Sequence, residues 1–294
     1  MSEGGINRTL RASKTTRTSA VAGLTAIALV GLLVGCSSSK SGSGDRTESG
    51  AATPTSTATS PVTMANGLPS TQTVNVASQV PVGTAGSSAT AANAFGVWQT
   101  MKQTRYQHTY SEDVATGSYF VDCVGWTSYL LSNSAPTANA SLRAGTGVTN
   151  KHFVPTPLKY ETFFNSLANK PQPGWSTISS VANLQPGDIM AWQPESNNTG
   201  PTVGHAIVVI GSAVQQQDGS YAVPVMDSTG TPHGPNDTRR TDPRNLTDSK
   251  GQPSGIGIGT IGFSVNGSGF PTAVIWSLGT KPVPKTIGMA RPTS

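Results

Sequence analysis

Three residues of the types used in nucleophilic catalysis by a thiol follow one another along the chain: Cys123, His205 and Asp227. A cysteine attacks a carbonyl carbon when a nearby base takes its proton, and a third group must orient that base. The chain has 2 cysteines, and Cys36 ends an N-terminal apolar segment. Cys123 therefore has no disulfide partner in the rest of the chain, which leaves it as a buried apolar side chain or a nucleophile.

The neighbours of Cys123 favour the nucleophile. Residues 119–121 (YFV) have the composition of a strand, and apolar residues follow Cys123 at the spacing of a buried helix: Trp126, Tyr129, Leu130 and Leu131. The spacing predicts a helix that begins at or near Cys123. The dipole of a helix favours a thiolate over a thiol at its N-terminus.

His205 is the candidate base among the 4 histidines of the chain, which also include His108, His152 and His233. It directly precedes residues 206–210 (AIVVI), a continuous β-branched run that predicts a central buried strand. A histidine at the start of a strand can have a purely structural role. The presence of a thiol nucleophile in the same chain favours a role as its base.

Asp227 is the candidate third group. It follows residues 221–226 (YAVPVM), a strand that we expect to pair with the strand after His205 in a hairpin. A carboxylate that accepts a hydrogen bond from one imidazole nitrogen fixes the tautomer of the ring. Two alternatives stay open: Asp227 forms a turn with the two residues after it, or His233 orients His205 instead.

The order of the predicted elements indicates an α+β fold in which N-terminal helices pack on an antiparallel β-sheet. Helices are predicted around residues 95–101, from Cys123 onward and within residues 153–167. Strands are predicted at residues 188–192, 206–210, 221–226, 259–265 and 272–277. Residues 257–262 have the pattern GxGxxG, but a strand-like segment follows them rather than a helix, so no dinucleotide site is expected.

The first 36 residues predict a targeting segment. Four cations precede an uncharged apolar stretch at residues 20–34, which is too short to cross a bilayer. Residues 33–36 (LVGC) resemble the bacterial lipoprotein box, which implies that Cys36 is acylated and becomes the mature N-terminus. We therefore expect an extracytoplasmic protein anchored in the lipid of the bacterial cell membrane. The alternative is an ordinary signal anchor in which Cys36 stands by chance.

Residues 37–91 predict a flexible tether, because small and polar residues predominate and cannot bury enough apolar surface to offset the entropy of ordering. We place the folded domain at residues 92–294. The formal charge of +5 includes the cations of the targeting segment. The remainder has no cluster of Lys and Arg interleaved with aromatic residues, so nucleic acid is not an expected partner.

Three segments resemble motifs of the NlpC-type cell-wall peptidases and their CHAP relatives, in the same order along the chain. Residues 119–126 (YFVDCVGW) resemble the Asp-Cys-Ser-Gly-Phe segment of that family. Residues 184–189 (LQPGDI) resemble its Leu-x-Pro-Gly-Asp strand, and residues 204–209 (GHAIVV) resemble its Gly-His-Val strand. The resemblance spans about residues 100–230.

The resemblance implies a papain-like fold and hydrolysis of amide bonds in peptidoglycan stem peptides. It implies Cys123 as the nucleophile, His205 as the base and a polar third residue where Asp227 stands. Tyr106 matches an upstream tyrosine that helps the backbone N–H of Cys123 to bind the oxyanion. No cofactor or metal is implied, and we expect a monomer with peptidoglycan as its partner.

The chain departs from the family pattern at three places. Val124 replaces the usual Ser after the nucleophile, residues 106–109 (YQHT) stand where a Gly-Gly loop is expected, and the third residue is Asp rather than His or Asn. These departures concern the oxyanion site and the substrate more than the nucleophile. The alternative functions are an acyl or peptidyl transferase with the same three residues and an inactive wall-binding module.

Residues 233–240 (HGPNDTRR) form a polar run that could be a metal or phosphate loop. We interpret them as a surface loop near the cleft. Arg239 or Arg240 would then be free to bind a carboxylate of the substrate with two hydrogen bonds.

Overall fold

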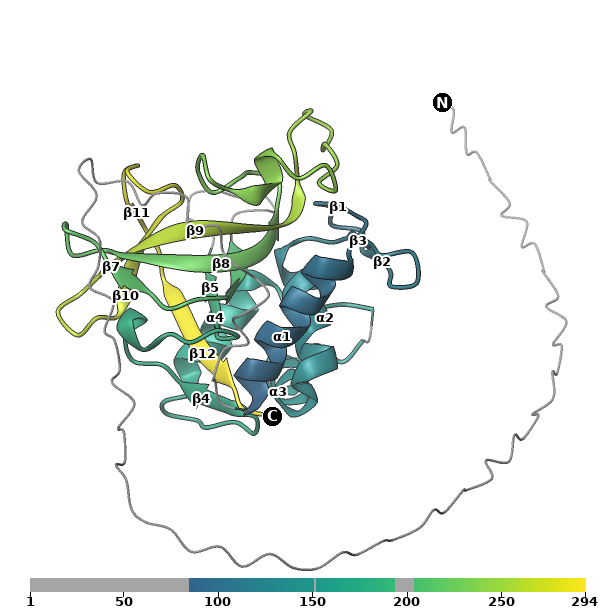
Figure 1. Ribbon diagram of the computed structural model, residues 1–294. Coiled ribbons are helices and arrows are strands. Elements are labelled where there is room, and N and C mark those ends of the chain that lie inside the picture. The colour runs from purple at the N-terminus through teal and green to yellow at the C-terminus, as the bar shows by residue number, and fades with distance from the viewer. Residues whose placement is uncertain (1–84, 151, 194–203) are drawn as a thin grey trace, which may run out of the picture. The chain divides into compact units, whose positions relative to one another are not determined.

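The computed structural model describes residues 85–150, 152–193 and 204–294 (Figure 1). The predicted targeting segment, Cys36 and residues 37–84 of the predicted tether lie outside these residues. Within the described part of the chain, no helix has the length and apolar character needed to span a membrane.

Four α-helices pack against one face of a large antiparallel sheet in the described residues (Figure 1). The helices are α1 (Ala85–Thr100), α2 (Cys123–Ser134), α3 (Pro136–Gly145) and α4 (Pro157–Ser166). The sheet has the order β11-β10-β9-β8-β6-β5-β12-β4, with β7 beside β8. Its strands are β4 (Trp175–Thr177), β5 (Ile189–Trp192), β6 (His205–Val209), β7 (Val214–Gln215), β8 (Tyr221–Thr229), β9 (Gly255–Val265), β10 (Pro271–Ile275), β11 (Val283–Pro284) and β12 (Ile287–Pro292). The predicted α+β class is confirmed.

A small second sheet precedes α2 in the sequence. It has the order β1-β3-β2, with β1 (Gln103–Arg105) parallel to β3 (Ser118–Phe120) and β2 (Ser111–Asp113) antiparallel to it. Because β3 leads directly toward Cys123, this sheet positions the start of α2. Two short 3₁₀ helices, η1 (Val181–Asn183) and η2 (Thr238–Arg240), lie in connections between strands.

Most predicted elements are confirmed, and the main differences lie at their ends. Helix α2 begins at Cys123, as the spacing predicts. Strands β6 and β8 pair in antiparallel fashion, as expected of the predicted hairpin. Strand β8 continues through Thr229, however, so Asp227 lies inside the strand and not at its end.

Strand β12 has no counterpart among the predicted strands. It lies between β5 and β4, with antiparallel pairing to both. Its 6 residues (IGMARP) include Gly, Ala and Pro, which are depleted in strands. The C-terminal strand is therefore an interior strand of the sheet, next to the edge strand β4, that composition alone does not reveal.

Helix α1 begins at Ala85, so the assignment of residues 85–91 to the tether is wrong. These residues are small or polar, which is also the composition of a disordered segment. Here small side chains permit close packing: a Cβ atom added to Gly86 would lie 2.6 Å from the carbonyl carbon of Thr293. Ser87, Thr90 and Ala91 are completely buried.

The two faces of the large sheet contribute to two separate cores. The face toward the helices includes Ala206, Val208 and Met226. The opposite face includes Ile207 and Val225. Four strands separate β10 from β12 in the sheet order, yet the two are in contact, so the sheet curls around the second core.

Side chains of a strand alternate between its two faces. His205 therefore lies on the same face of β6 as Ile207, and Asp227 lies on the same face of β8 as Val225. Both candidate residues therefore project from the concave face of the sheet, from two neighbouring strands. Because β6 and β8 are adjacent and both side chains lie on the same face, His205 and Asp227 meet.

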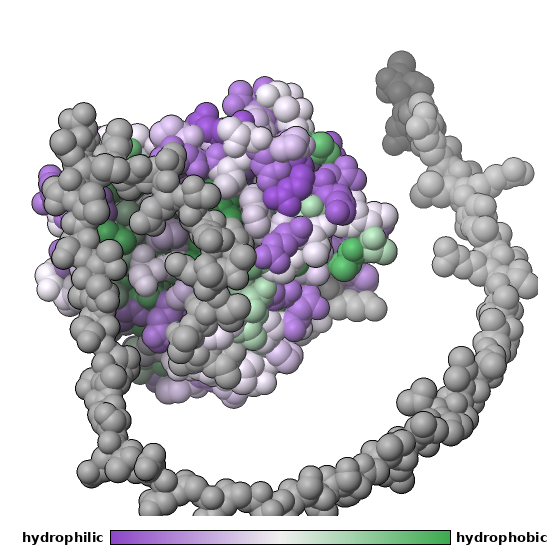
Figure 2. Space-filling view, viewed as in Figure 1, coloured by the Kyte–Doolittle hydropathy of each residue, from purple (hydrophilic) through white to green (hydrophobic). Residues whose placement is uncertain are grey.

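The molecular surface is mostly hydrophilic on the face that Figure 2 shows, and the hydrophobic residues visible there are scattered. Large exposed apolar side chains among the described residues are Val114, Phe153, Leu158, Val214 and Val283. They come from separate elements and loops. Isolated exposed apolar residues of this kind are ordinary on a protein surface.

Candidate active site

Cys123 is the first residue of α2, and its side chain is buried. Asp122 precedes it as the N-cap, and its Oδ1 atom accepts a hydrogen bond from the backbone N–H of Gly125 at 2.8 Å. The backbone N–H groups of Cys123 and Val124 belong to the first turn of α2, where the N–H groups of a helix have no intrahelical acceptor. They remain available at the positive end of the helix dipole, where they can stabilise a negatively charged oxygen.

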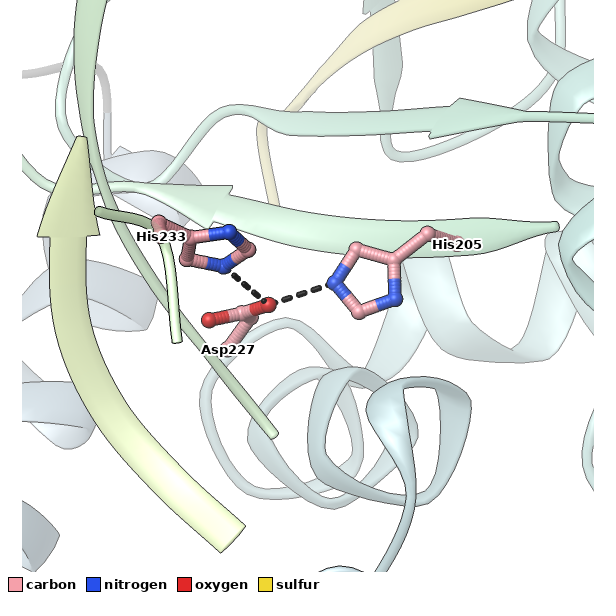
Figure 3. Close-up of side chains that lie close together, drawn as sticks. All are labelled: His205, Asp227 and His233. Carbon is pink, nitrogen blue, oxygen red and sulfur yellow. Dashed lines mark hydrogen bonds and ion pairs between the residues drawn. The ribbon is translucent and has the colours of Figure 1, made fainter. Parts of the chain in front are cut away.

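His205 is the first residue of β6, and it lies between the thiol and Asp227. Its Nε2 atom hydrogen-bonds to Oδ2 of Asp227 (Figure 3). Cys123 and His205 also share a hydrogen bond. Since Nε2 is engaged by Asp227, Nδ1 is the ring nitrogen available to the thiol.

The surroundings of His205 favour its protonated form. Burial lowers the pKa of His205, but the charge of Cys123 and the hydrogen bonds to Asp227 and Cys123 raise it further than burial lowers it. The resulting pKa of His205 is about 10, above its ordinary value of 6.5. An imidazolium beside a cysteine stabilises a thiolate, which is the reactive form of that side chain.

Asp227 is completely buried and accepts hydrogen bonds on both carboxylate oxygens. Its Oδ2 atom accepts from His205 and from Nε2 of His233 at 2.9 Å (Figure 3). Its Oδ1 atom accepts from the Arg239 guanidinium at 2.5 Å. Burial raises the pKa of Asp227, but the charges and hydrogen bonds of these neighbours hold it well below its ordinary value of 3.8. Asp227 is therefore a carboxylate at any pH near neutrality.

The structure distinguishes the two alternatives for orienting His205. Asp227 is part of β8 and not of a turn. His233 contacts Asp227 through the same carboxylate oxygen that binds His205, while the rings of His233 and His205 have centroids 6.2 Å apart. Asp227 is thus the group in contact with His205, and His233 lies behind it (Figure 3).

The predicted role of Arg239 in binding a substrate carboxylate is wrong, because its side chain is buried and already paired. Only 1% of Arg239 is exposed. Its guanidinium contacts Asp227 and, at 2.7 Å, Oδ2 of Asp237. The polarity of the segment suggested a surface loop, but the segment folds inward over β9. Arg240 is exposed, and its Nε atom donates to the carbonyl of Gly234 at 2.6 Å.

Tyr106 lies near the candidate nucleophile, as the resemblance implies for an oxyanion donor. Its side chain is partly buried. Burial, followed by the negative charges of Cys123, Asp122 and Asp227, raises the pKa of Tyr106. The phenol therefore stays protonated and can donate a hydrogen bond at neutral pH.

Tyr110 and His108 belong to the same region and were not among the predicted site residues. Nδ1 of His108 lies 2.9 Å from Oδ2 of Asp122. Tyr110 hydrogen-bonds to the same carboxylate, and burial together with the charge of Asp122 raises its pKa. Both residues come from an irregular loop, where no periodic pattern signals a contact. The available clue was that His108 lies within, and Tyr110 directly after, the segment of residues 106–109 that departs from the Gly-Gly loop.

Aromatic rings enclose His205 on the concave face of the sheet. The rings of Trp192 and Trp276 each have centroids 5.2 Å from that of His205. Such surroundings exclude water from the imidazole and strengthen its interaction with Asp227.

His205, Asp227 and His233 could also be considered as metal ligands, since their ligand atoms lie within 4.8 Å of one another. Two imidazoles and a carboxylate suit several divalent metals. Both Nε2 atoms, however, hydrogen-bond to one oxygen of Asp227, and the Arg239 guanidinium occupies the other. A metal ion would lie beside this fixed positive charge, so the residues fit a hydrogen-bonded network better than a metal site.

Comparison of the chain with models of protein families, with curated proteins and with solved structures finds no match in any of the three. The geometry of the described residues is therefore what supports a function for this chain. That geometry brings together a thiol, an imidazole and a carboxylate from α2, β6 and β8.

Proposed function

We propose that this chain is a cysteine hydrolase of amide bonds, with Cys123 as nucleophile, His205 as base and Asp227 as the group that orients the base. One observation carries the proposal. His205 hydrogen-bonds to Asp227 through Nε2 and shares a second hydrogen bond with Cys123 at the N-terminus of a helix. A buried cysteine with a purely structural role has no need of an oriented base.

The proposed reaction begins with attack of the Cys123 thiolate on the amide carbonyl carbon. The carbonyl oxygen becomes an oxyanion, which accepts hydrogen bonds from the backbone N–H of Cys123 and from the Tyr106 hydroxyl. The His205 imidazolium then donates the Nδ1 proton to the leaving amine as the C–N bond breaks. A thioester between Cys123 and the acyl group remains.

Water completes the reaction. The neutral imidazole of His205 takes a proton from a water molecule, and the oxygen attacks the thioester carbon. The C–S bond breaks, the carboxylic acid leaves, and the thiolate–imidazolium pair returns. Throughout the cycle Asp227 stays ionised and holds the Nε2 proton of His205 in place.

Peptidoglycan stem peptides are the proposed substrate class. Support comes from the resemblance of the three sequence motifs and from the predicted lipoprotein signal, which would expose the enzyme to the cell wall. The proposed fold is papain-like: a helix that begins with the nucleophilic cysteine packs on an antiparallel sheet that carries the base. The described α+β arrangement is compatible with this assignment.

Mass spectrometry of digested muropeptides tests the proposal. The wild-type protein should release fragments whose mass is consistent with the addition of water across one amide bond, and Cys123→Ala should release none while keeping its circular dichroism spectrum. Products joined to an added amine would instead identify a transferase. Absence of any product from several peptidoglycan types, together with a Cys123 that resists iodoacetamide at neutral pH, would identify a binding module.

A further inference from the structure

We infer that His233 is a positioning residue for the proposed reaction, acting by donating a hydrogen bond from Nε2 to Oδ2 of Asp227. This inference rests on the proposed function, because it concerns the group that orients the base. His233 contacts neither the thiol nor His205 directly in a hydrogen bond. Its effect on the reaction passes through Asp227 (Figure 3).

Three donors from three elements hold the Asp227 carboxylate. His205 comes from β6, His233 from the segment after β8, and Arg239 from η2. The first two share Oδ2, and Arg239 takes Oδ1. Rotation of the carboxylate away from His205 would therefore also break the bonds to the other two donors, which fixes its orientation.

The segment that carries His233 is held rigidly at this position. The backbone N–H of His233 donates to Oδ2 of Asp237 at 2.7 Å, and the same oxygen accepts from Nη1 of Arg239 at 2.7 Å. The His233 side chain is completely buried. These two bonds to Asp237 fix the backbone from which the His233 ring projects.

Strand β9 makes room for this segment with two glycines of the GxGxxG pattern. A Cβ atom added to Gly259 would lie 3.0 Å from Cβ of His233 and 2.8 Å from a carboxylate oxygen of Asp237. A Cβ atom added to Gly257 would lie 2.5 Å from Cγ of Arg239. The glycines thus allow the network to pack directly on the strand.

The surroundings of the two ring nitrogens of His233 indicate that Nε2 carries the proton and donates it to Asp227. Nδ1 is buried and has no hydrogen-bond partner among the described residues, while Nε2 faces the carboxylate. The ring also packs against Trp276, with centroids 4.2 Å apart. A proton on Nε2 satisfies the contact with Asp227, whereas a proton on Nδ1 alone would leave two acceptors facing each other.

The His205 and His233 imidazoles share Oδ2 of Asp227. Because the negative charge of this oxygen acts on both rings, it holds the proton of His205 less strongly than it would alone. The charged or titratable groups in contact with His233 and Asp227 are His205, Asp237 and Arg239. The Tyr106 phenol is close enough to feel the charge of Asp227, and Cys123 interacts with His205. If the His233 donor is removed, more of the carboxylate charge acts on His205. The imidazolium is then bound more tightly and donates its proton to the leaving amine more slowly.

Two substitutions separate the hydrogen bond from the volume of the ring. His233→Leu removes the donor, whereas His233→Gln keeps a side-chain N–H. His233→Leu should lower kcat about 10- to 100-fold with little change in KM, and should move the basic limb of the pH profile upward. His233→Gln should recover most of the lost kcat and restore the limb. The control His152→Leu changes an exposed histidine.

Equal losses in His233→Leu and His233→Gln, with the pH profile unchanged in both, would overturn the inference. Nitrogen-15 spectra of the imidazoles in the wild-type protein provide a test that needs no variant. We expect the proton of His233 on Nε2; a proton on Nδ1 alone would contradict the inference. This readout needs no substrate, so it can fail while peptidoglycan hydrolysis stands, and it can succeed where hydrolysis fails.

Discussion

Arg239 has a buried guanidinium whose nitrogens are occupied by protein oxygens. Nε donates to the carbonyl of Gly255 at 2.7 Å, Nη1 donates to Asp237, and Nη2 donates to Asp227. The Arg239 cation therefore contacts two buried carboxylates at once, and for Asp237 it is the charged partner. Burying charges without a partner is costly, so this arrangement depends on the arginine more than an exposed ion pair would.

Replacement of Arg239 by methionine should lower the free energy of unfolding by about 3–5 kcal/mol, because Asp237 stays buried without a cation and Asp227 loses one of its charged partners. Urea denaturation followed by circular dichroism measures the change. Arg240→Met is the matched control, since Arg240 is exposed, and should change stability by no more than about 0.5 kcal/mol. Wild-type stability in Arg239→Met would contradict the described ion pairs.

The raised pKa of His205 predicts the pH dependence of hydrolysis. The reactive thiolate–imidazolium pair requires protonated His205, so kcat/KM should fall as the pH rises through about 10, the pKa of His205. Asp227 adds no acid limb near neutrality, because its pKa lies well below 3.8. Initial rates between about pH 5 and pH 11 measure the profile. A basic limb close to pH 6.5 would show that His205 is not stabilised as described.

The raised pKa of His205 should also make the folding stability depend on pH. A pKa that is higher in the folded than in the unfolded chain stabilises the protein fully below the unfolded value, here 6.5. That contribution is lost progressively as the pH rises toward about 10. The carboxylate of Asp227 acts in the opposite direction, with stability lost as the pH falls below its ordinary value of 3.8.

At the residue scale, the site residues that could be predicted from the sequence lie on helices and strands. Cys123 is a lone thiol before a helical pattern, and His205 and Asp227 flank predicted strands that pair. Arg239 was misjudged because sequence polarity does not reveal whether an ion pair is buried. The contact of Tyr110 with Asp122 depends on a loop conformation that no local pattern encodes.

At the scale of elements, the first turn of α2 and the loop that contains Tyr110 fit together closely. Gly125 lies in that turn, and a Cβ atom added to it would be 2.9 Å from Cε1 of Tyr110. Tyr110 in turn contacts the helix cap, Asp122. The absence of a side chain at residue 125 therefore allows the loop to approach the start of the helix.

Gly125→Ala should displace the Tyr110 ring and lower the rate of peptidoglycan hydrolysis about 10-fold or more, because the loop and the cap of α2 shift beside Cys123. Gly96→Ala is the matched control in α1, where an added Cβ atom meets no atom within 4 Å. That change should stabilise the protein by about 0.5–1 kcal/mol. Thermal unfolding and rate measurements on both variants separate the two effects. Unchanged hydrolysis by Gly125→Ala would contradict a functional contact.

Elements were predictable where hydrophobic periodicity is strong. Helix α2 and strands β5, β6 and β8 have clear apolar patterns, and β6 and β8 follow one another closely enough in the chain for a hairpin to be predicted. Strand β12 has a mixed composition, and its position between β5 and β4 is set by contacts far away in the sequence. The start of α1 was not predicted, because its small residues are also typical of a disordered segment. In the structure these small side chains allow α1 to pack closely against the C-terminal residues.

At the scale of the whole described domain, its two ends are tied together. The carbonyl oxygen of Ser294 accepts a hydrogen bond from the backbone N–H of Ala138 at 2.9 Å. Gly86 of α1 packs closely against Thr293, the residue after β12. Helix α1 and the C-terminal strand thus stabilise each other. The domain that we propose to be the hydrolase therefore extends from α1 to the last residues of the chain.

The 2 cysteines of the chain should have separate chemical roles, which single substitutions can distinguish. Cys36 is the predicted acylation site, and Cys123 is the proposed nucleophile. In bacteria grown with labelled palmitate, Cys36→Ala should lose the label, since no other cysteine occupies the lipoprotein box. Cys123→Ala should keep the label and the membrane association of the wild type, because its substitution leaves the targeting segment unchanged.

Hydrolysis should show the reverse pattern. Purified Cys36→Ala should still digest peptidoglycan, since the described site contains no residue from the first 36, whereas Cys123→Ala should not. Label on Cys36→Ala would overturn the predicted anchor without affecting the proposed enzyme. Hydrolysis by Cys123→Ala would overturn the nucleophile without affecting the anchor. Because each variant fails in only one assay, attachment to the membrane and catalysis can be judged independently.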